Sequence, residues 1–224
     1  MPIKKFYIKE AIKFGWEKMK SNFWILVTII IVVWLVGSLP AWIEKATQAK
    51  TPALSFVFAI ISVLLQFIIS IGLIKISLKL CDSQKPKVSD LFSGYPLFLN
   101  YLIVSIVYGL IVMAGFILLI VPGIIWAIKY QFAQYLVIDK GYKPIEAIKK
   151  SGQITKDAKW SLLLLGLLSG LINVLGAIAL VVGLFATVPT TMVAKAFVYR
   201  KLLEHPEAET EPQSTSPTPP VPII

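Results

Sequence analysis

Lysines placed inside or beside otherwise apolar segments are the residues of this chain most suited to chemistry. Lys129 follows a long uncharged run, and polar side chains continue after it at Tyr130, Gln131, Gln134 and Tyr135. A lysine within a membrane segment costs about 3 kcal/mol on insertion scales and by default indicates a functional site. An ammonium group forms strong hydrogen bonds with phosphate and carboxylate oxygens. The pattern therefore predicts a wet, inward-facing cavity in which Lys129, Gln131 and Gln134 contact an anion or a lipid phosphate.

Lys195 is a second lysine within an apolar run, and we expect it to share this site. The spacing places the backbone of Lys129 near the bilayer middle, seven residues from Pro122 and ten from Asp139. A structural interpretation stays open beside the functional one. Lys129 would then extend along its helix and bond neighbouring glutamine and tyrosine groups.

Groups for acid–base catalysis or metal binding are absent from the predicted spans. His205 is the only histidine and lies in the tail, and no predicted span contains Asp or Glu. Proton relays, carboxylate dyads and histidine metal sites therefore have no candidate residues. We expect no enzyme activity, no metal and no cofactor. Asp82, Asp90, Asp139 and Asp157 lie beside lysines in the predicted inner connections, where we expect salt bridges.

The composition is that of a membrane protein, with 57% hydrophobic residues, 15% charged residues and a mean hydropathy of +0.78. The net charge of +10 is compatible with nucleic acid or with anionic lipid. Because the lysines flank apolar runs, we predict anionic lipid headgroups as partners and no nucleic acid. Cys81 is the only cysteine, so no disulfide can form within the chain.

Segment lengths predict an all-α integral membrane bundle, because a helix needs about 20 residues to cross a hydrocarbon core of about 30 Å. Two long uncharged runs exceed this length and must fold back, the first at a predicted structural turn formed by Pro122 and Gly123. Residues 1–204 then form a membrane domain, and residues 205–224 a disordered cytoplasmic tail. Six transmembrane helices in three hairpins are expected near 23–43, 53–74, 97–120, 122–138, 159–178 and 181–202.

Basic residues are distributed unequally between the two sides of this arrangement. Of the 22 Lys and Arg residues, 20 fall on one side and only Lys45 and Lys50 on the other. Loops rich in Lys and Arg remain cytoplasmic. We therefore predict a multi-pass protein of a prokaryotic plasma or inner membrane, with both termini in the cytoplasm.

The first twenty residues form an amphipathic pattern, with apolar residues such as Ile12, Gly15 and Trp16 on one face and lysines on another. Cytoplasmic interfacial amphipathic helices are therefore predicted, and packing of this helix on its own bundle is the alternative.

The motif Glu-Ala-Ile-Lys at 10–13 recurs at 146–149. At the same offset, Lys, Trp and Leu at 20, 24 and 26 match 156, 160 and 162, which indicates an internal repeat.

In each copy a tryptophan, Trp24 or Trp160, lies at the start of a span, where its ring is favoured as an interface anchor.

The small-residue pairs Gly166/Gly170 and Ser105/Gly109 predict close helix contacts, within one chain or between two. Oligomeric state does not follow from these pairs.

Residues 121–151, VPGIIWAIKYQFAQYLVIDKGYKPIEAIKKS, carry a resemblance to a known family. With Pro122-Gly123, Lys129, Asp139, Glu146-Ala147 and Ser151, the stretch resembles the membrane domain of some bacterial glycerophosphoryl diester phosphodiesterases and related stand-alone membrane proteins. The resemblance implies a six-helix arrangement over most of residues 1–204 and supplies no catalytic residues. Because no soluble phosphodiesterase domain follows in this sequence, we do not expect phosphodiester hydrolysis.

Three functions are compatible with the sequence. The first is a scaffold or accessory membrane domain without catalysis, with a possible membrane protein partner. The second is transport or lipid handling through a basic inward-facing cavity around Lys129 and Lys195. A membrane-embedded hydrolase is the third, although it lacks a recognisable catalytic group.

Overall fold

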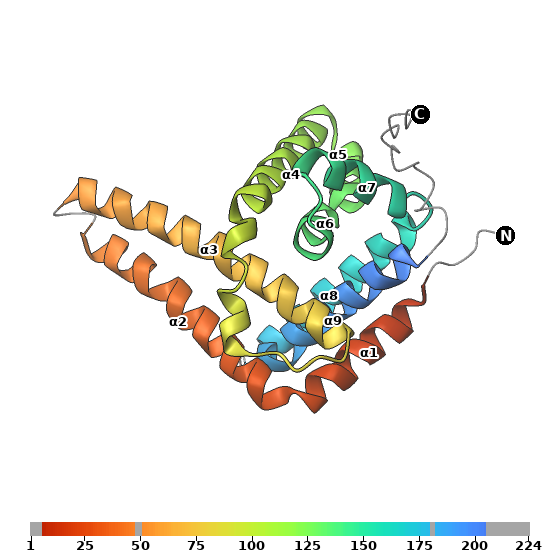
Figure 1. Cartoon of the computed structure of the whole chain (residues 1–224), viewed down its shortest axis with the longest axis horizontal. Helices are drawn as coiled ribbons and strands as arrows, with labels where there is room; N and C mark the ends of the chain where they lie inside the picture. Colours follow the sequence, from red (N-terminus) through yellow and green to blue (C-terminus); the bar gives the residue numbers. More distant parts are fainter. Residues whose placement is uncertain (1–5, 48–50, 180–181, 205–224) are drawn as a thin grey trace, which may run out of the picture.

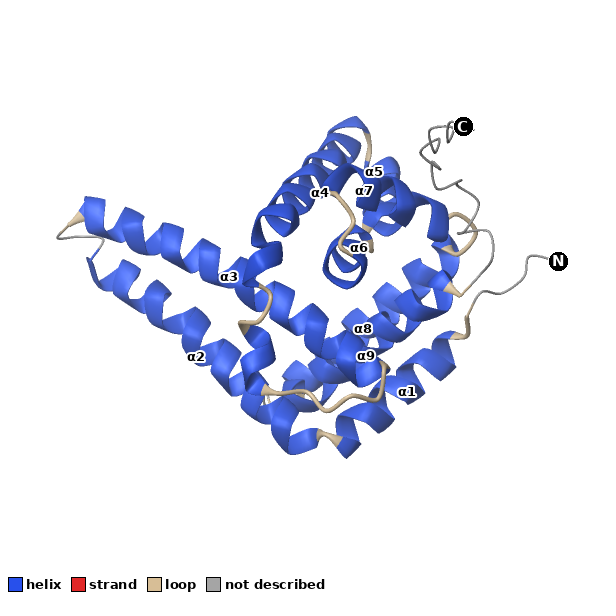
Figure 2. Cartoon of the chain, viewed as in Figure 1, coloured by secondary structure: helices blue, strands red, loops and turns tan. Residues whose placement is uncertain are grey.

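A computed structural model describes residues 6–47, 51–179 and 182–204, and in this part of the chain the protein contains helices and no strands (Figure 2). The predicted tail at 205–224 and Lys50 lie outside the described residues. The α-helices are α1 (Ile8–Ser21), α2 (Phe23–Thr47), α3 (Pro52–Cys81), α4 (Phe98–Leu118), α5 (Ile120–Tyr130), α6 (Ala133–Lys140), α7 (Pro144–Ile154), α8 (Lys159–Ile178) and α9 (Leu184–Leu203). Two short 3-10 helices, η1 (Val88–Leu91) and η2 (Tyr95–Leu97), precede α4.

Four of the described helical segments are long and apolar enough to cross a membrane, and they lie in α2, α3, α4 with the residues before it, and α8. Their outward surfaces expose large apolar side chains, including Trp34, Leu110 and Leu167. A soluble protein rarely exposes apolar surface of this extent. The fold is therefore all-helical and fits a membrane protein. The segments predicted at 122–138 and 181–202 are not among these four.

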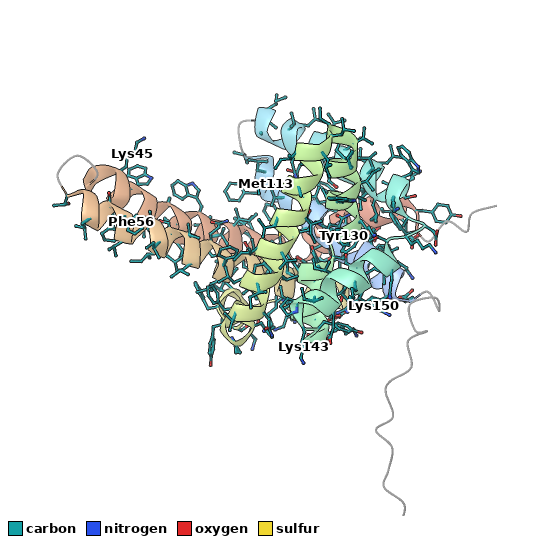
Figure 3. All side chains as sticks on the ribbon, turned by 90° about the horizontal axis from the view of Figure 1, so that it is seen from above. Lys45, Phe56, Met113, Tyr130, Lys143 and Lys150 are labelled. Carbon is teal, nitrogen blue, oxygen red and sulfur yellow. The ribbon has the colours of Figure 1, made fainter. Side chains whose placement is uncertain are left out.

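Helices α2 and α3 run side by side and extend away from the rest of the molecule as an arm (Figure 1). Lys45 and Phe56 lie near the far end of this arm (Figure 3). The 30 residues of α3 measure about 45 Å. This helix continues seven residues beyond the predicted end at residue 74, because Ile76 and Leu80 are buried in the body of the protein.

The span was predicted to end at residue 74, before Lys75 and Lys79. In the structure both lysines lie within α3 and have partners in the segment that follows the helix. Nζ of Lys75 donates to the Ser93 carbonyl at 3.1 Å, and Nζ of Lys79 lies 2.6 Å from Oδ1 of Asp90. The Asp90 carboxylate also accepts the Lys87 backbone N–H at 2.8 Å. These contacts hold η1 against α3, so the charged residues continue the helix instead of ending it.

The chain reverses between α4 and α5 three residues before the predicted turn. Leu119 has the extended dihedrals φ −167° and ψ 157°, whereas Pro122 lies in the first turn of α5, where its missing N–H is not needed. Gly123 faces Phe116, and a Cβ on Gly123 would lie 2.6 Å from that ring. On the α4 side, a Cβ on Gly115 would lie 2.8 Å from Gly123 Cα. Pro122 and Gly123 therefore start and pack α5, and the turn itself lies at Leu119.

The predicted span 122–138 is two helices, α5 with 11 residues and α6 with 8. The break between them is bridged by hydroxyl groups from the segment at α7. Ser151 Oγ donates to the Lys129 carbonyl at 3.0 Å and accepts the Phe132 N–H at 3.2 Å, and Thr155 Oγ1 donates to the same carbonyl at 2.9 Å. These bonds satisfy backbone groups that the end of a helix leaves without partners. The interruption is thus a stabilised part of the fold, which hydrophobicity alone does not reveal.

Helix α1 packs on α9, which is the alternative that the amphipathic pattern left open. Its buried residues are Ala11, Gly15 and Met19. Gly15 permits the close approach, because a Cβ there would lie 2.2 Å from the Thr190 carbonyl oxygen. Trp16, assigned to the apolar face from the sequence, is 44% exposed. The packed face therefore contains Gly15 and Met19 of the predicted apolar face, with Ile8 and Ile12 partly buried, and only Trp16 lies outside it.

Among the described residues, the glycines of the predicted small-residue pairs make no close helix contact. A Cβ built on Gly109, Gly166 or Gly170 meets no atom within 4 Å. Helices α8 and α9 instead approach closely at Gly176 and Gly183, where a Cβ on Gly183 would lie 2.5 Å from the Gly176 carbonyl oxygen. The spacing of the glycines was correct for helix packing, but the faces that carry them point away from the neighbouring helices.

Arg200, near the end of α9, joins three helices. Its guanidinium donates two hydrogen bonds to Asp82 at 3.0 and 2.7 Å and one to Asp139 at 2.7 Å. The Tyr199 hydroxyl donates to the same Asp139 carboxylate at 3.0 Å. Asp82, Asp90 and Asp139 therefore form salt bridges as expected, Asp90 with Lys79 and the other two with Arg200.

Candidate anion-binding sites

A basic cleft of about 550 Å³ lies where the end of α5 meets α7 and the start of α8. Four lysines contribute to its lining, and no carboxylate does. Like charges brought together in this way repel one another and favour an incoming anion. We call this site the basic cleft, with the lining residues Lys129, Tyr130, Ile148, Lys149, Gly152, Gln153, Lys156 and Lys159.

Local helix geometry explains how these side chains meet. Lys129 lies in the last turn of α5, and Lys149 and Gln153, four residues apart, lie on one side of α7. Lys156 follows in the turn after α7, and Lys159 is the first residue of α8. Gly152 makes room for Lys129, because a Cβ there would lie 3.0 Å from Lys129 Cε. The cleft therefore depends on a small residue in α7 opposite the end of α5.

The charges of the basic cleft are not neutralised by carboxylates of the described residues. No salt bridge within this part of the chain involves any of the four lysines. Nζ of Lys129 lies 5.0 Å from the ring centroid of Tyr130, a weak cation–π contact. A phosphate group, with up to two negative charges and several acceptor oxygens, suits this arrangement better than a carboxylate.

A second pocket, of about 370 Å³, surrounds Lys195. We call it the Lys195 pocket, and its lining residues are Ile74, Gln131, Gln134, Tyr135, Leu162, Leu165, Gly166, Ser169, Thr191, Met192 and Lys195. Gln134 Nε2 donates to Ser105 Oγ at 3.0 Å, and Gln131 Nε2 donates to the Ile128 carbonyl at 3.1 Å. Gln134 is thus held by α4 and Gln131 by the end of its own helix α5, and a single cationic side chain faces the pocket.

The predicted site is divided between these two pockets. Lys129 belongs to the basic cleft, whereas Gln131, Gln134 and Lys195 line the other pocket. The separation follows from the break after α5, because the residues on its two sides do not continue one helical face.

Sequence reasoning missed three lysines of the basic cleft, Lys149, Lys156 and Lys159, because they were counted only among the basic residues of the predicted cytoplasmic side. The helical spacing of Lys149 and Gln153 was a signal for one of them, whereas Lys156 and Lys159 lie beyond the end of α7. Lys129 lines the same cleft as these three lysines, so it is one member of a basic group and not a single isolated charge.

The two predicted interface anchors are exposed in a similar way. Trp24 is 80% exposed and Trp160 is 79% exposed. Each lies in the first turn of its helix, α2 or α8. Large exposed indoles at such positions are suited to the boundary between lipid and water.

The helices and pockets describe an all-α protein with an apolar exterior and a basic cleft. No family model matches the chain, and neither the curated proteins nor the solved structures contain a match. The assignment of function therefore depends on the geometry of the site.

Proposed function

We propose that this chain is a multi-pass membrane protein that binds the phosphate headgroup of an anionic lipid in its basic cleft. The main observation in support is that four lysines, and no carboxylate of the described residues, line one cleft. Exposed apolar side chains of α8, such as Leu164 and Trp160, continue from the same region. A ligand with a phosphate head and an acyl tail would satisfy both surfaces. The role is lipid handling, and the proposal assigns no catalytic step to the cleft.

A scaffold or accessory role is compatible with the same binding site. Lipid bound beside α7 would fix the protein in a particular membrane environment, and a membrane protein partner would then find it there. The resemblance of residues 121–151 to the membrane domain of glycerophosphoryl diester phosphodiesterases stays a proposal of the same kind. It associates the chain with lipid phosphodiesters but supplies no reaction.

We further propose that six segments enter the membrane as three hairpins, α2 with α3, α4 with α5 followed by α6, and α8 with α9. Packing of consecutive helices in each pair supports this arrangement. Apolar side chains at the ends of the pairs support it as well, including Leu39, Leu119 and Val182. Helix α5 measures only about 16 Å, which is too short to cross the membrane alone. In this arrangement α5 and α6 together form the second arm of the hairpin that begins with α4.

The two proposed repeat units show matching burial at matching positions. Ala11 and Ala147 are both 0% exposed, and Leu26 and Leu162 are both buried. Glu10 and Glu146 are both exposed. Equivalent burial after an offset of 136 residues supports the interpretation of α1–α2 and α7–α8 as related units.

Binding of a short-chain phosphatidate by the purified protein in a non-ionic detergent tests the lipid proposal. Lys129→Met and Lys149→Met are expected to weaken binding about tenfold each, because each removes a charge-assisted contact. Lys143→Met is the matched control, since Lys143 is exposed and does not line the cleft. Inorganic phosphate in a parallel titration separates a lipid site from a site for free phosphate. Equal phosphatidate affinity in all variants would contradict the proposal.

The proposed threading has its own test, single-cysteine labelling in a Cys81→Ser background. A cysteine at Thr51 should react from outside intact cells, and one at Lys85 only after the cytoplasmic side is opened. Both positions are exposed. The reverse labelling pattern would reject the orientation.

A further inference from the structure

The Lys195 pocket differs from the basic cleft in charge and in the nature of its walls. One ammonium group faces it, beside side chains that are mainly apolar, among them Ile74, Leu162, Leu165 and Met192. Pockets for small molecules combine apolar walls with a few polar groups that orient the ligand. The Lys195 pocket has this composition, and its volume of about 370 Å³ lies in the range for such sites.

Lys195 has only aromatic partners within the described residues. Its Nζ lies 6.0 Å from the ring centroid of Phe132 and 5.8 Å from that of Tyr135, and no carboxylate of this part of the chain lies within salt-bridge distance. A half-buried cation with no anionic partner is unfavourable in surroundings of low dielectric. A ligand with one negative charge would supply the missing partner, whereas a phosphate with two charges would exceed it.

Polar groups continue from this pocket into the contact between α8 and α9. Thr191, which lines the pocket, accepts a hydrogen bond from Asn173 Nδ2 at 3.3 Å. Asn173 Oδ1 is buried and has no hydrogen-bond partner, and the same is true of Thr187 Oγ1 one turn from Thr191. These two atoms belong to the contact between α8 and α9 and do not line the pocket. Apart from Lys195, the polar residues that line it are Gln131, Gln134, Tyr135, Ser169 and Thr191.

We propose that the Lys195 pocket binds the carboxylate of a small amphiphile such as a short fatty acid. The carboxylate pairs with the Lys195 ammonium, and the alkyl chain lies against Leu162, Leu165 and Met192. This site is independent of the basic cleft, because the two pockets share no lining residue. The protein then has two anion sites of different chemistry, one for a phosphate head and one for a carboxylate head.

Hexanoate is a suitable probe, with acetate to remove the tail and hexanol to remove the charge. Binding is measured by saturation-transfer NMR titration of the purified full chain in a non-ionic detergent. We expect Lys195→Met to weaken hexanoate binding about tenfold to a hundredfold, the range for loss of a hydrogen bond to a charged group. Lys143→Met is the matched control and should bind hexanoate as the wild type does, since Lys143 is exposed and lines neither pocket. Hexanol should bind wild type and Lys195→Met equally, and acetate should not bind measurably.

A second variant keeps the proposal testable if Lys195→Met fails to fold. Gly166 lines the pocket, and a Cβ there meets no atom within 4 Å. Gly166→Leu should therefore occupy the pocket without a clash and abolish hexanoate binding while leaving the thermal unfolding transition in place. The proposal is overturned if Gly166→Leu or a folded Lys195→Met retains wild-type hexanoate affinity. It is overturned equally if wild type binds hexanol as tightly as hexanoate, or if Lys143→Met loses hexanoate binding. Loss of phosphatidate binding in Lys129→Met alone concerns the basic cleft, so failures of the two proposals are distinguishable.

Discussion

The break between α5 and α6 is stabilised by one buried hydroxyl, and its removal has a calculable effect. Ser151 is 0% exposed, and its Oγ accepts the Phe132 N–H while donating to the Lys129 carbonyl. In Ser151→Ala the Phe132 N–H loses this acceptor, although the carbonyl keeps its bond from Thr155. An unsatisfied buried donor costs about 1–3 kcal/mol. We expect the free energy of unfolding to fall by that amount.

A double-mutant cycle makes the expectation more specific. Thr155→Ala alone leaves the Lys129 carbonyl bonded to Ser151, so its polar cost is about 1 kcal/mol or less. When both hydroxyls are removed, that carbonyl also loses its partners, which adds about 1–3 kcal/mol beyond the sum of the single changes. Two donors that share one acceptor should therefore show non-additive stabilities.

Unfolding by increasing SDS in mixed micelles, followed by far-UV circular dichroism, measures these free energies. Ser21→Ala is the matched control, because the Ser21 hydroxyl bonds a carbonyl of its own helix at an exposed position. Its effect should stay within about 0.5 kcal/mol. Additive losses in the double variant, or a Ser151→Ala protein as stable as Ser21→Ala, would refute the assignment of Ser151 as the bridge.

Substitutions at Arg200 and Gly123 have expected outcomes in the same unfolding assay, and a substitution at Asp90 has one in hydrogen exchange. Arg200→Met should destabilise the protein by about 2–4 kcal/mol, because it leaves the half-buried Asp139 without its main cation, and Arg200→Lys should recover only part of this loss. Gly123→Leu should cost about 1–3 kcal/mol or more by separating α4 from α5, whereas Gly109→Ala, with open space at its Cβ, should be neutral or stabilising. Asp90→Asn should weaken the attachment of η1 to α3, detected as faster hydrogen exchange in η1 than in α8.

Hydrophobicity and charge are local properties of the chain, so much of the fold was accessible to sequence reasoning. The apolar runs that begin at Phe23, Ala53 and Trp160 are helices in the structure. The all-helical class and the membrane character follow from them, since a long apolar segment needs a regular backbone in lipid. The number of spans and the orientation stay predictions.

Helix interruptions and helix faces were less accessible, because they depend on neighbours far along the chain. Residues 122–138 contain no glycine or proline at the break, and the interruption is stabilised by Ser151 from another helix. The glycines at 109, 166 and 170 have the spacing of packing motifs, but they face open space. Sequence spacing specifies that residues share a face and leaves open what that face contacts.

The sequence by itself determined the residue types of the candidate sites, including Lys129, Lys195, Gln131 and Gln134. Only the tertiary structure decided their grouping, because α7 and the turn after it bring Lys149 and Lys156 to Lys129 while α9 brings Lys195 to the two glutamines. The physical reason is that a charge is a property of one side chain, whereas a binding site is a property of the distances between side chains from different helices. Lys129 and Lys195, which sequence reasoning placed in one basic cavity, therefore line two separate pockets of different charge.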